Sequence, residues 1–562
     1  MRFKVIGSGS VGSTANGLDI LGKRVLGQLS FPADAEITVE VPAFAVIAAD
    51  VFEAFLKRNR IEPAELGGLS DRQIARTFQN AELPKGLMEE FPSIIDGLDG
   101  PLVVRPSSVL EETLDRTIAG IYLAKPIPNH GMNLDRRRRQ LAEAVKLVWA
   151  STFFSDAVNW RLGAGGSPEE EQMAVVVQRA VGAVHGRCFY PTVSVVARSY
   201  NHYPTPGNEP GDGVVALALG FGKSIGEDHH WSYCPERPTA PPPFKSMGDQ
   251  LKYTQTSFWA LDLGDDLAPD PSAGGEYMVR LGLADAERDG TLELLASTYD
   301  AESDRLRAGI DGSGARVLTF APILRSRSIP FTSIIKDLME KARAVAGQEV
   351  EIEIAVCLDP KTGVPVRFGI VQLKTMTGRS QGETLGADDL DADDVVVASQ
   401  GCLGNGIRRD LDDIVYLRPD AFDRNQTRTM AAELEAVNRG LLEEGRSAIF
   451  VGFGRWGTTD DRYGVPVRWG QISSAQVIVE ITLADAPMNV SQGTHFFHHL
   501  LSQKVLYLSV KHDGPHAVDF DWLDRQEAVW EGRYVCHSRL EKPVTVNVDG
   551  ESRRGLISRS VE

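Results

Sequence analysis

The chain of 562 residues lacks several features that would place it in an easily recognised class. Its five cysteines are scattered and none stands in a Cys-x-x-Cys pair, which indicates neither a disulfide framework nor a zinc site. Apolar runs long enough to span a membrane are missing, as is a signal-peptide pattern, so we expect a soluble, cytoplasmic protein without a membrane partner. The net charge of −18 argues against a nucleic-acid partner, because phosphate backbones are held chiefly by clustered Lys and Arg.

The length of the sequence and the position of its non-periodic, acidic segment predict several domains. A single core stops growing at about 250 to 300 residues, so this chain should contain more than one. Residues 379–394, RSQGETLGADDLDADD, are acidic and lack apolar periodicity, which predicts an interdomain linker. Before it, short β-branched runs alternate with helical patterns over residues 1–378, as in a mixed α/β domain. After it, strand candidates around a helix near 427–444 predict a smaller α/β domain over 395–512, followed by a β-rich cap over 513–562.

Two carboxylates lie two residues apart on a predicted strand. Glu351 and Glu353 precede a hairpin whose second strand ends in Gln372 and Lys374, and a period of two puts each pair on one face. Two carboxylates and an amide oxygen are hard ligands suited to Mg²⁺, which bridges nucleotide phosphates, while Lys374 would neutralise remaining phosphate charge. The alternative is a solvated face on which acidic and basic residues merely pair across strands.

A second cation stands far upstream in PLVVRPSS. Arg105 ends an apolar run just before small polar residues, where a guanidinium could grip phosphate oxygens bidentately and Ser107 and Ser108 could add hydroxyl donors. An arginine at a strand end can equally be an ordinary surface residue.

Four segments in order resemble the phosphoenolpyruvate synthase and pyruvate phosphate dikinase family. They are PLVVRPSSVLEETLDRTIAGIYL at 101–123, MAVVVQRAVGA at 173–183, GFGKSIGE at 220–227, and EIEIAV at 351–356 with IVQLKTM at 370–376. The resemblance implies an ATP-grasp fold, in which nucleotide is held between two α/β lobes. The chain looks like a standalone form without the family's C-terminal barrel.

Carried over by residue, the resemblance implies that Arg105 contacts phosphate and that Glu351, Glu353 and Gln372 hold the metal. It places Gln178, on the MAVVVQ strand, near the adenine.

Two departures from the family pattern concern catalysis. The family's N-terminal glycine, glycine, lysine is Gly12, Ser13, Thr14 here, so a phosphate-binding lysine is missing. The family's late arginine is Lys374, which keeps the charge but loses the bidentate fork. These losses bear on turnover more than on nucleotide binding.

The second domain resembles the family's swivelling domain. SQGCLGNGI at 399–407 has the layout of its glycine-rich opening, and SQGTHFFHHLLSQKVLYLSV at 491–510 places His495 at the phosphohistidine position. Neutral imidazole is a nucleophile near neutral pH, which suits that role. A structural role on a helix with His498 and His499 remains an alternative, and His495 with His499 could also form a metal pair.

Residues 453–473, FGRWGTTDDRYGVPVRWGQIS, are dense in Gly, Trp, Arg and Asp. Arg455 and Arg468 with Trp456 and Trp469 could form a stacked or anion-binding surface, or the tryptophans could simply pack the turns.

The sequence therefore predicts an ATP-dependent phosphotransferase that uses ATP and Mg²⁺, with Arg105, Lys374 and His495 as its catalytic residues. The acceptor would be a histidine, a small molecule or another protein. The rival prediction is a catalytically silent nucleotide-binding sensor, suggested by Thr14. A homo-oligomer is compatible with either.

Overall fold

The computed structural model divides the chain into two compact units. Unit 1 contains residues 1–115, 122–154 and 169–376, and unit 2 contains residues 116–121, 155–168 and 377–562. The structure describes residues 3–30, 37–110, 121–130, 133–163, 167, 171–201, 208–227, 230–240, 247–252, 254–264, 270–312, 314–326, 329–359, 364–376, 385–404, 406–458, 463–484, 500, 505–514, 516–550 and 552–559.

The first sheet of unit 1 has five strands in the order β1-β3-β6-β4-β5. They are β1 (Lys4–Ile6), β3 (Phe44–Ile47), β6 (Met173–Arg179), β4 (Leu102–Ser108) and β5 (Lys125–Ile127). The central strand β6 is antiparallel to both β3 and β4 and is buried along nearly its whole length. This burial explains why MAVVVQ reads as a continuous apolar run instead of an alternating one.

The second sheet of unit 1 has six strands in the order β11-β10-β9-β17-β18-β2. They are β11 (Trp231–Tyr233), β10 (Val214–Ala218), β9 (Val193–Arg198), β17 (Val350–Asp359), β18 (Val364–Thr375) and β2 (Ile37–Glu40). The predicted antiparallel hairpin is confirmed as β17 and β18. Val350, Ile352 and Ile354 face the core, where they join apolar residues of helix α13 (Phe331–Ala346) such as Ile335 and Leu338.

Two smaller sheets complete the strands of unit 1. One has the order β13-β12-β8-β7, with β13 (Met278–Gly282), β12 (Ser257–Asp262), β8 (Cys188–Tyr190) and β7 (Ala183–His185). The other has the order β15-β14-β16, with β15 (Arg305–Ala308), β14 (Ala296–Asp300) and β16 (Ala315–Leu318).

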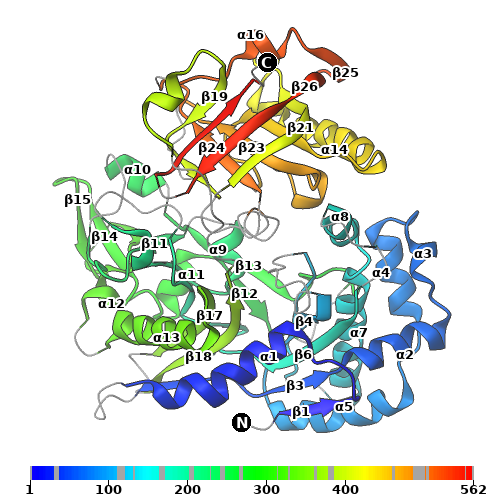
Figure 1. The fold of residues 1–562 in the computed structure, drawn as a ribbon. Coiled ribbons are helices and arrows are strands. Elements are labelled where there is room, and N and C mark those ends of the chain that lie inside the picture. The colour runs from blue at the N-terminus through cyan, green and yellow to red at the C-terminus, as the bar shows by residue number, and fades with distance from the viewer. Residues whose placement is uncertain are drawn as a thin grey trace. The chain divides into compact units, whose positions relative to one another are not determined.

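The helices of unit 1 surround these sheets (Figure 1). They are α1 (Gly12–Ile20), α2 (Ala49–Asn59), α3 (Pro63–Leu66), α4 (Asp71–Asn80), α5 (Lys85–Leu98), α7 (Leu134–Ser151), α9 (Lys223–Glu227), α10 (Met247–Lys252), α11 (Leu283–Arg288), α12 (Ala321–Arg325) and α13 (Phe331–Ala346). Helix α1 contacts both β4 of the first sheet and β18 of the second, so it ties the two sheets together.

Unit 2 is built on a nine-stranded sheet in the order β19-β27-β26-β21-β22-β23-β24-β20, with β25 paired to β26. The strands are β19 (Val395–Ser399), β20 (Cys402–Leu403), β21 (Gly406–Leu417), β22 (Ala448–Phe453), β23 (Ala475–Ile481), β24 (Leu506–Val510), β25 (Glu527–Glu531), β26 (Val535–Asp549) and β27 (Arg554–Ser558). Strands β21, β22, β23 and β24 run parallel to their neighbours in that series. Strands β25, β26 and β27, from the segment expected to form a cap, pair within this same sheet.

The described helices of unit 2 are α8 (Ser155–Gly163), α14 (Thr427–Glu443) and α16 (Phe520–Leu523). Helix α14 confirms the helix expected near 427–444 and buries one face that includes Met430, Leu434 and Leu441. Helix α8 precedes the sheet by more than 200 residues, yet Asn159 donates to the backbone oxygen of Gly470 at 2.9 Å.

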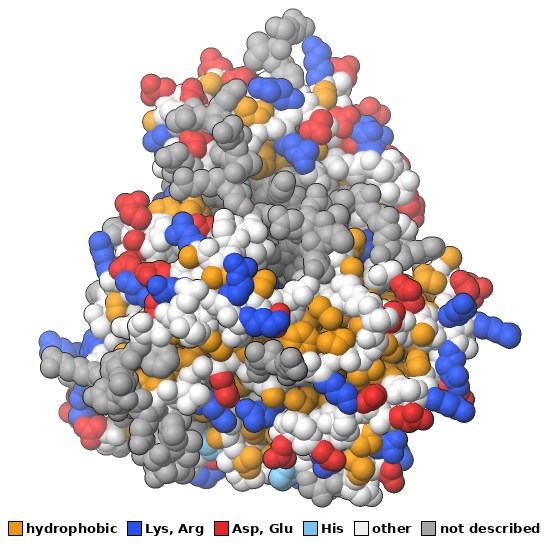
Figure 2. All heavy atoms as spheres, turned by 60° about the horizontal axis from the view of Figure 1, so that its bottom comes forward, with side chains coloured by type: hydrophobic (Ala, Val, Ile, Leu, Met, Phe, Trp, Pro, Cys, Tyr) orange, Lys and Arg blue, Asp and Glu red, His pale blue; other side chains and the backbone are white. Residues whose placement is uncertain are grey.

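The chain is thus a mixed α/β protein, as the sequence predicts. None of the described helices is long and apolar enough to cross a membrane. On the face shown in Figure 2, acidic and basic side chains are interspersed around hydrophobic ones, so the acidic excess forms no single patch there.

Candidate functional site

Three adjacent strands of the second sheet place charged residues in one row. In the register of β9, β17 and β18, Glu351 lies opposite Arg198 on one side and Lys374 on the other. In the next row Glu353 lies between Val196 and Gln372. The two carboxylates therefore share one sheet face with Gln372 and Lys374, because side chains alternate along each strand and the apolar alternates face the core.

Glu351 is held between two cations. The Nε of Arg198 donates to Oε2 of Glu351 at 2.7 Å, and the Nζ of Lys374 lies 4.0 Å from Oε1. Only 4% of the Arg198 side chain, 9% of Lys374 and 2% of Glu351 are exposed. Arg198 was not singled out from the sequence, although it ends an apolar run, VSVVAR, in the same way as Arg105 does. Its charge is needed because a buried carboxylate is stable only when it is paired.

Glu353 is reached from both sheets. The Nζ of Lys374 donates to Oε1 of Glu353 at 3.3 Å, and the Nη1 of Arg105, on β4 of the first sheet, lies 3.8 Å from Oε2. Burial lowers the pKa of Arg105, and the charge of Glu353 opposes that shift. The Nε of Arg105 is buried with no hydrogen-bond partner among the described residues.

Thr14, at the position where the family pattern has lysine, links the same two sheets. Its side chain is 3% exposed, and its hydroxyl donates to the backbone oxygen of Pro106 on β4 at 3.0 Å. The Nε2 of Gln372 on β18 donates to this hydroxyl at 3.5 Å. Thr14 is therefore a packed connector at the edge of the charged group.

The start of α1 is fixed against β4 by a glycine and a serine. Gly12 has φ +73°, and a Cβ there would lie 2.1 Å from the backbone oxygen of Ser107, so a larger residue is excluded. The Ser107 hydroxyl donates to the backbone oxygen of Val11, and the Ser108 hydroxyl donates to Glu171. Both hydroxyls considered from the sequence as phosphate donors are thus engaged within the fold.

Gln178 lies on β6, on the same face of the first sheet as Arg105. In the register of β4 and β6, Arg105 is opposite Val176 and Val103 is opposite Gln178. The Gln178 side chain is 1% exposed, and its Nε2 is buried without a hydrogen-bond partner among the described residues. A buried amide donor of this kind is what a ligand acceptor atom could satisfy.

The chemistry of the donor set fits Mg²⁺ in combination with phosphate. Among the described residues, no group of three or more His, Cys, Asp or Glu side chains is placed to hold a metal by itself. Glu351 and Glu353 supply two carboxylates, and Gln372, whose Nε2 points to Thr14, has an amide oxygen as its other polar end. Mg²⁺ in proteins commonly takes one or two carboxylates and completes its shell with water and substrate phosphates.

His495 and the neighbouring His498 and His499 lie outside the described residues. Their predicted roles therefore stay predictions.

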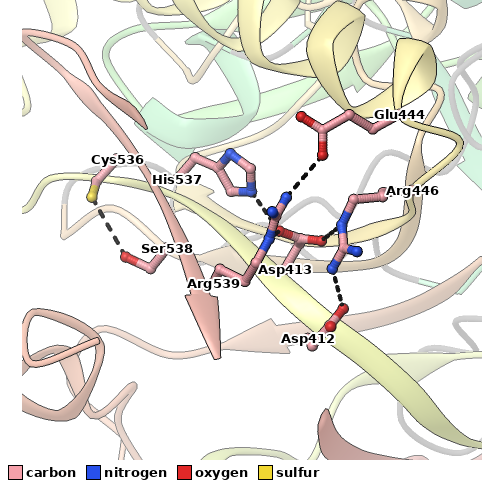
Figure 3. Close-up of polar contacts among 8 residues, drawn as sticks. All are labelled: Asp412, Asp413, Glu444, Arg446, Cys536, His537, Ser538 and Arg539. Atoms are coloured by element: carbon pink, nitrogen blue, oxygen red, sulfur yellow. Dashed lines mark hydrogen bonds and ion pairs between the residues drawn. The ribbon is translucent and has the colours of Figure 1, made fainter. Parts of the chain in front are cut away.

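Unit 2 contains a second dense charged group, which we call the Asp413 cluster (Figure 3). Asp413 on β21 is fully buried, and its carboxylate is bonded by His537 Nε2 at 2.8 Å, Arg539 Nε at 3.0 Å and Arg446 Nε. Arg446 also donates to Asp412 at 2.7 Å, and Arg539 to Glu444 at 3.0 Å.

These partners decide the ionisation of Asp413. Burial alone would raise the pKa of Asp413, but the hydrogen bonds from His537, Arg446 and Arg539 outweigh it and lower the pKa to about 2. Each of these donors is engaged with a carboxylate, which makes the cluster a structural clamp between β21, β26 and the end of α14.

The two tryptophans of the 453–473 segment are buried. Trp456 is 0% exposed and Trp469 is 4% exposed, so their rings pack the turns and form no stacking surface.

Comparison with known proteins identifies the first part of the chain. Residues 10–229 match the sequence model of the pyruvate phosphate dikinase AMP/ATP-binding domain. No curated protein matches the chain. The matched segment contains Thr14, Arg105, Gln178 and Arg198, whereas β17 and β18 lie beyond it. Residues 10–229 are thus similar to the AMP/ATP-binding domain of pyruvate phosphate dikinase.

Proposed function

We propose that this chain is an ATP-dependent phosphotransferase whose nucleotide phosphates bind between Arg105 and the polar face of the second sheet. The observation that carries the proposal is the approach of Arg105, from the family-matched β4, to Glu353 on β17. The two sheets would then act as the two lobes of an ATP-grasp arrangement, tied together by α1.

The charge balance of the site favours a polyanion. Arg105, Arg198 and Lys374 supply three positive charges, while Glu351 and Glu353 supply two negative ones. Both Arg105 and Lys374 contact Glu353, which at 27% exposure is the more accessible of the two carboxylates. Phosphate oxygens could replace Glu353 as their partner, because cations preorganised in a partly dry site stabilise phosphoryl charge.

Arg198 has a positioning role in this proposal. Its short hydrogen bond fixes Glu351, which is nearly inaccessible, on the face that Glu353 and Gln372 share. Glu351, Glu353 and Gln372 would hold Mg²⁺, which when bound would neutralise charge on the phosphate oxygens. Gln178 would direct its buried Nε2 to an acceptor atom of the adenine.

The phosphoryl acceptor is proposed to be His495 or a bound small molecule. A phosphorylated histidine is recognised by its stability, because the phosphorus–nitrogen bond is weakened when the ring becomes protonated. Label on His495 should be lost in acid and retained in alkali.

A nucleotide-binding sensor without turnover is the second candidate. The observation that favours it is Thr14, which stands at the family's lysine position and is packed between Pro106 and Gln372. A neutral hydroxyl cannot supply the charge that a lysine brings to a transferring phosphoryl group.

Incubation of the full chain with Mg²⁺ and γ-labelled ATP separates the two candidates. Label retained on the protein, or ATP consumed in the presence of an acceptor, supports the phosphotransferase. Saturable ATP binding with neither result supports the sensor. If calorimetry detects no ATP binding, both candidates are wrong.

A further inference from the structure

The parallel strands of unit 2 end together at one edge of the sheet. Gly454, just after β22, donates its N–H to Ile481 at the end of β23, and Thr482 donates to Val510 at the end of β24. In parallel α/β sheets, ligands bind outside the carboxyl ends of the strands, because loops diverge there and leave a crevice. The residues at this edge are therefore candidates for a ligand-binding site.

A buried carboxyl group lies at this edge. Glu480, one residue before the end of β23, is 6% exposed. Its Oε1 accepts from the backbone N–H of Trp456 at 2.5 Å, and its Oε2 accepts from the hydroxyl of Tyr507 on β24. Burial raises the pKa of Glu480 to about 7, although these hydrogen bonds and the charge of Arg455 oppose the shift.

Two glycines shape the loop that brings Arg455 to this edge. Gly454 has φ +71°, which turns the chain sharply after β22. A Cβ at Gly452 would lie 2.4 Å from the Trp456 ring, so only glycine lets that ring pack on the strand. With Trp456 anchored on one side and Gly454 on the other, Arg455 has little freedom of position.

The Arg455 side chain is only partly exposed, yet no ion-pair partner for it lies among the described residues. Its Nε is buried without a hydrogen-bond partner, and no carboxylate in the described part of the chain lies within the 4.0 Å of an ion pair. Glu480 influences Arg455 through its charge, but its two oxygens are bonded to Trp456 and Tyr507. Burial lowers the pKa of Arg455 because no bonded counter-charge offsets it fully.

A second arginine in the same segment forms an ordinary surface ion pair. The sequence contains two Arg-Trp-Gly triplets, beginning at Arg455 and Arg468. Arg468 is 59% exposed and lies 3.5 Å from Asp156, as expected for a surface ion pair. Arg455 shares the local sequence but not the partner.

We propose that Arg455 is the anion-binding residue of a second ligand site, which takes a small oxyanion, phosphate or carboxylate, at the carboxyl edge of the parallel strands. A planar guanidinium matches the paired oxygens of either group, and unsatisfied buried donors are costly unless a ligand completes them. Glu480 lies beside the ligand, and its charge controls the affinity for the anion. When Glu480 is neutral, Arg455 is available to the anion. When Glu480 is ionised, its carboxylate competes with the anion for Arg455. Among the described residues, the charged and titratable groups that face Glu480 are Arg455 and Tyr507.

The test uses the full chain carrying Arg105→Ala, so that anions cannot be held by that arginine in unit 1. Inorganic phosphate and acetate are titrated separately by calorimetry, which distinguishes the two ligand sources. Adding Arg455→Gln should lower the affinity for whichever anion binds by roughly tenfold or more, the usual effect of losing a charge-assisted contact. The matched Arg468→Gln should change it less than twofold.

A pH series supplies a readout that a merely structural role would not move. Acetate is ionised at both pH 6 and pH 8, so a weaker affinity for acetate at pH 8 reflects a change in the ionisation of the protein and not of the ligand. That weakening should disappear in Glu480→Gln, which stays neutral. Thermal melting of each variant shows whether it has folded.

Any of three outcomes would overturn the proposal. Neither anion binds the chain that carries Arg105→Ala alone. Adding Arg455→Gln leaves the protein folded and the affinity for the anion unchanged, or adding Arg468→Gln lowers that affinity as much as Arg455→Gln does. If Arg455→Gln does not fold, Arg455→Lys takes its place and should weaken binding while keeping the charge. The site is independent of nucleotide binding in unit 1, so either proposal can fail alone.

Discussion

Two buried carboxyl groups in the same sheet of unit 2 have opposite ionisation behaviour. Asp413 is 0% exposed with a pKa near 2, whereas Glu480 is 6% exposed with a pKa raised to about 7. Burial raises the pKa in both cases. The difference is in the donors: two arginines and a histidine bond Asp413, while a backbone N–H and a tyrosine hydroxyl bond Glu480.

The arginines of the molecule divide in the same way. Arg446 and Arg539 are engaged with Asp413 and its acidic neighbours, and they hold strands and a helix together. Arg105 and Arg455 each keep a buried Nε without a partner in the described part of the chain. We call a charged group saturated when its hydrogen-bonding atoms are bonded within the fold, and unsaturated when a buried donor is left without a bond. Saturated groups stabilise the fold, whereas unsaturated buried donors retain the capacity to bind a ligand.

Breaking the saturated group should have the largest effect. We expect Asp413→Asn to lower the free energy of unfolding by about 3 to 5 kcal/mol, because it leaves two arginines and a histidine without their counter-charge. Urea unfolding of the full chain measures the loss. Asp412→Asn is the control: it removes a half-exposed partner of Arg446 alone and should cost about 1 kcal/mol or less. Equal losses in the two variants would show that the cluster is not centred on Asp413.

Removing an unsaturated arginine should affect binding and leave stability nearly unchanged. Arg105→Ala should weaken Mg²⁺–ATP binding by roughly 10 to 150-fold, the equivalent of about 1.5 to 3 kcal/mol. Its urea midpoint should stay close to that of the parent, because a desolvated charge is removed along with its contact. Arg179→Ala, at the end of β6 and paired with Glu40, serves as the control in calorimetry. Unchanged ATP affinity in Arg105→Ala would falsify the nucleotide site proposed here.

The two carboxyl groups should make the free energy of unfolding depend on pH in opposite directions. The folded pKa of Asp413 lies below its ordinary 3.8, so its contribution is present above that value and is lost as the pH falls toward 2. The folded pKa of Glu480 lies above its ordinary 4.5, so stability decreases as the pH rises from 4.5 to 7, by at most about 1.4 kcal/mol per pH unit. Urea midpoints across this range should fall in the parent and flatten in Glu480→Gln. A parallel fall in both proteins contradicts the assignment.

The smallest effect is expected from Lys374→Arg. The site already places two arginines beside Glu351 and Glu353, and the longer guanidinium restores the bidentate fork of the family pattern. ATP turnover, or affinity if there is no turnover, should change less than about tenfold. A greater loss would mean that the site is built around the compact ammonium of Lys374.

Much of the polar face of β17 and β18 could be predicted from local sequence. The alternation of Glu351, Ile352, Glu353 and Ile354 specifies which residues share a face, because a strand repeats every two residues. The hairpin then brings Gln372 and Lys374 opposite the two carboxylates. Their roles as ligands of metal and phosphate stay predictions.

Other parts of the site could not be predicted from local sequence. Arg198 became part of the site because β9 pairs with β17, a contact between residues separated by more than 150 positions. Arg105 was a candidate from the sequence, but its approach to Glu353 depends on the packing of α1 between β4 and β18. In unit 2, the arginine of one Arg-Trp-Gly triplet pairs with Asp156, whereas Arg455 of the other triplet has no ion-pair partner among the described residues.

The sequence by itself determined the alternation of faces, the turns that require glycine, and the resemblance of residues 10–229 to a nucleotide-binding family. Each of these depends on neighbours a few residues apart, where backbone geometry and side-chain size suffice. The tertiary structure alone decided which charges are saturated and which are not. Whether every donor of a buried arginine finds an acceptor depends on strand pairing over long separations. That pairing bonds the Nε of Arg446 and Arg539 to Asp413, and it leaves the Nε of Arg105 and Arg455 without a hydrogen bond in the described part of the chain.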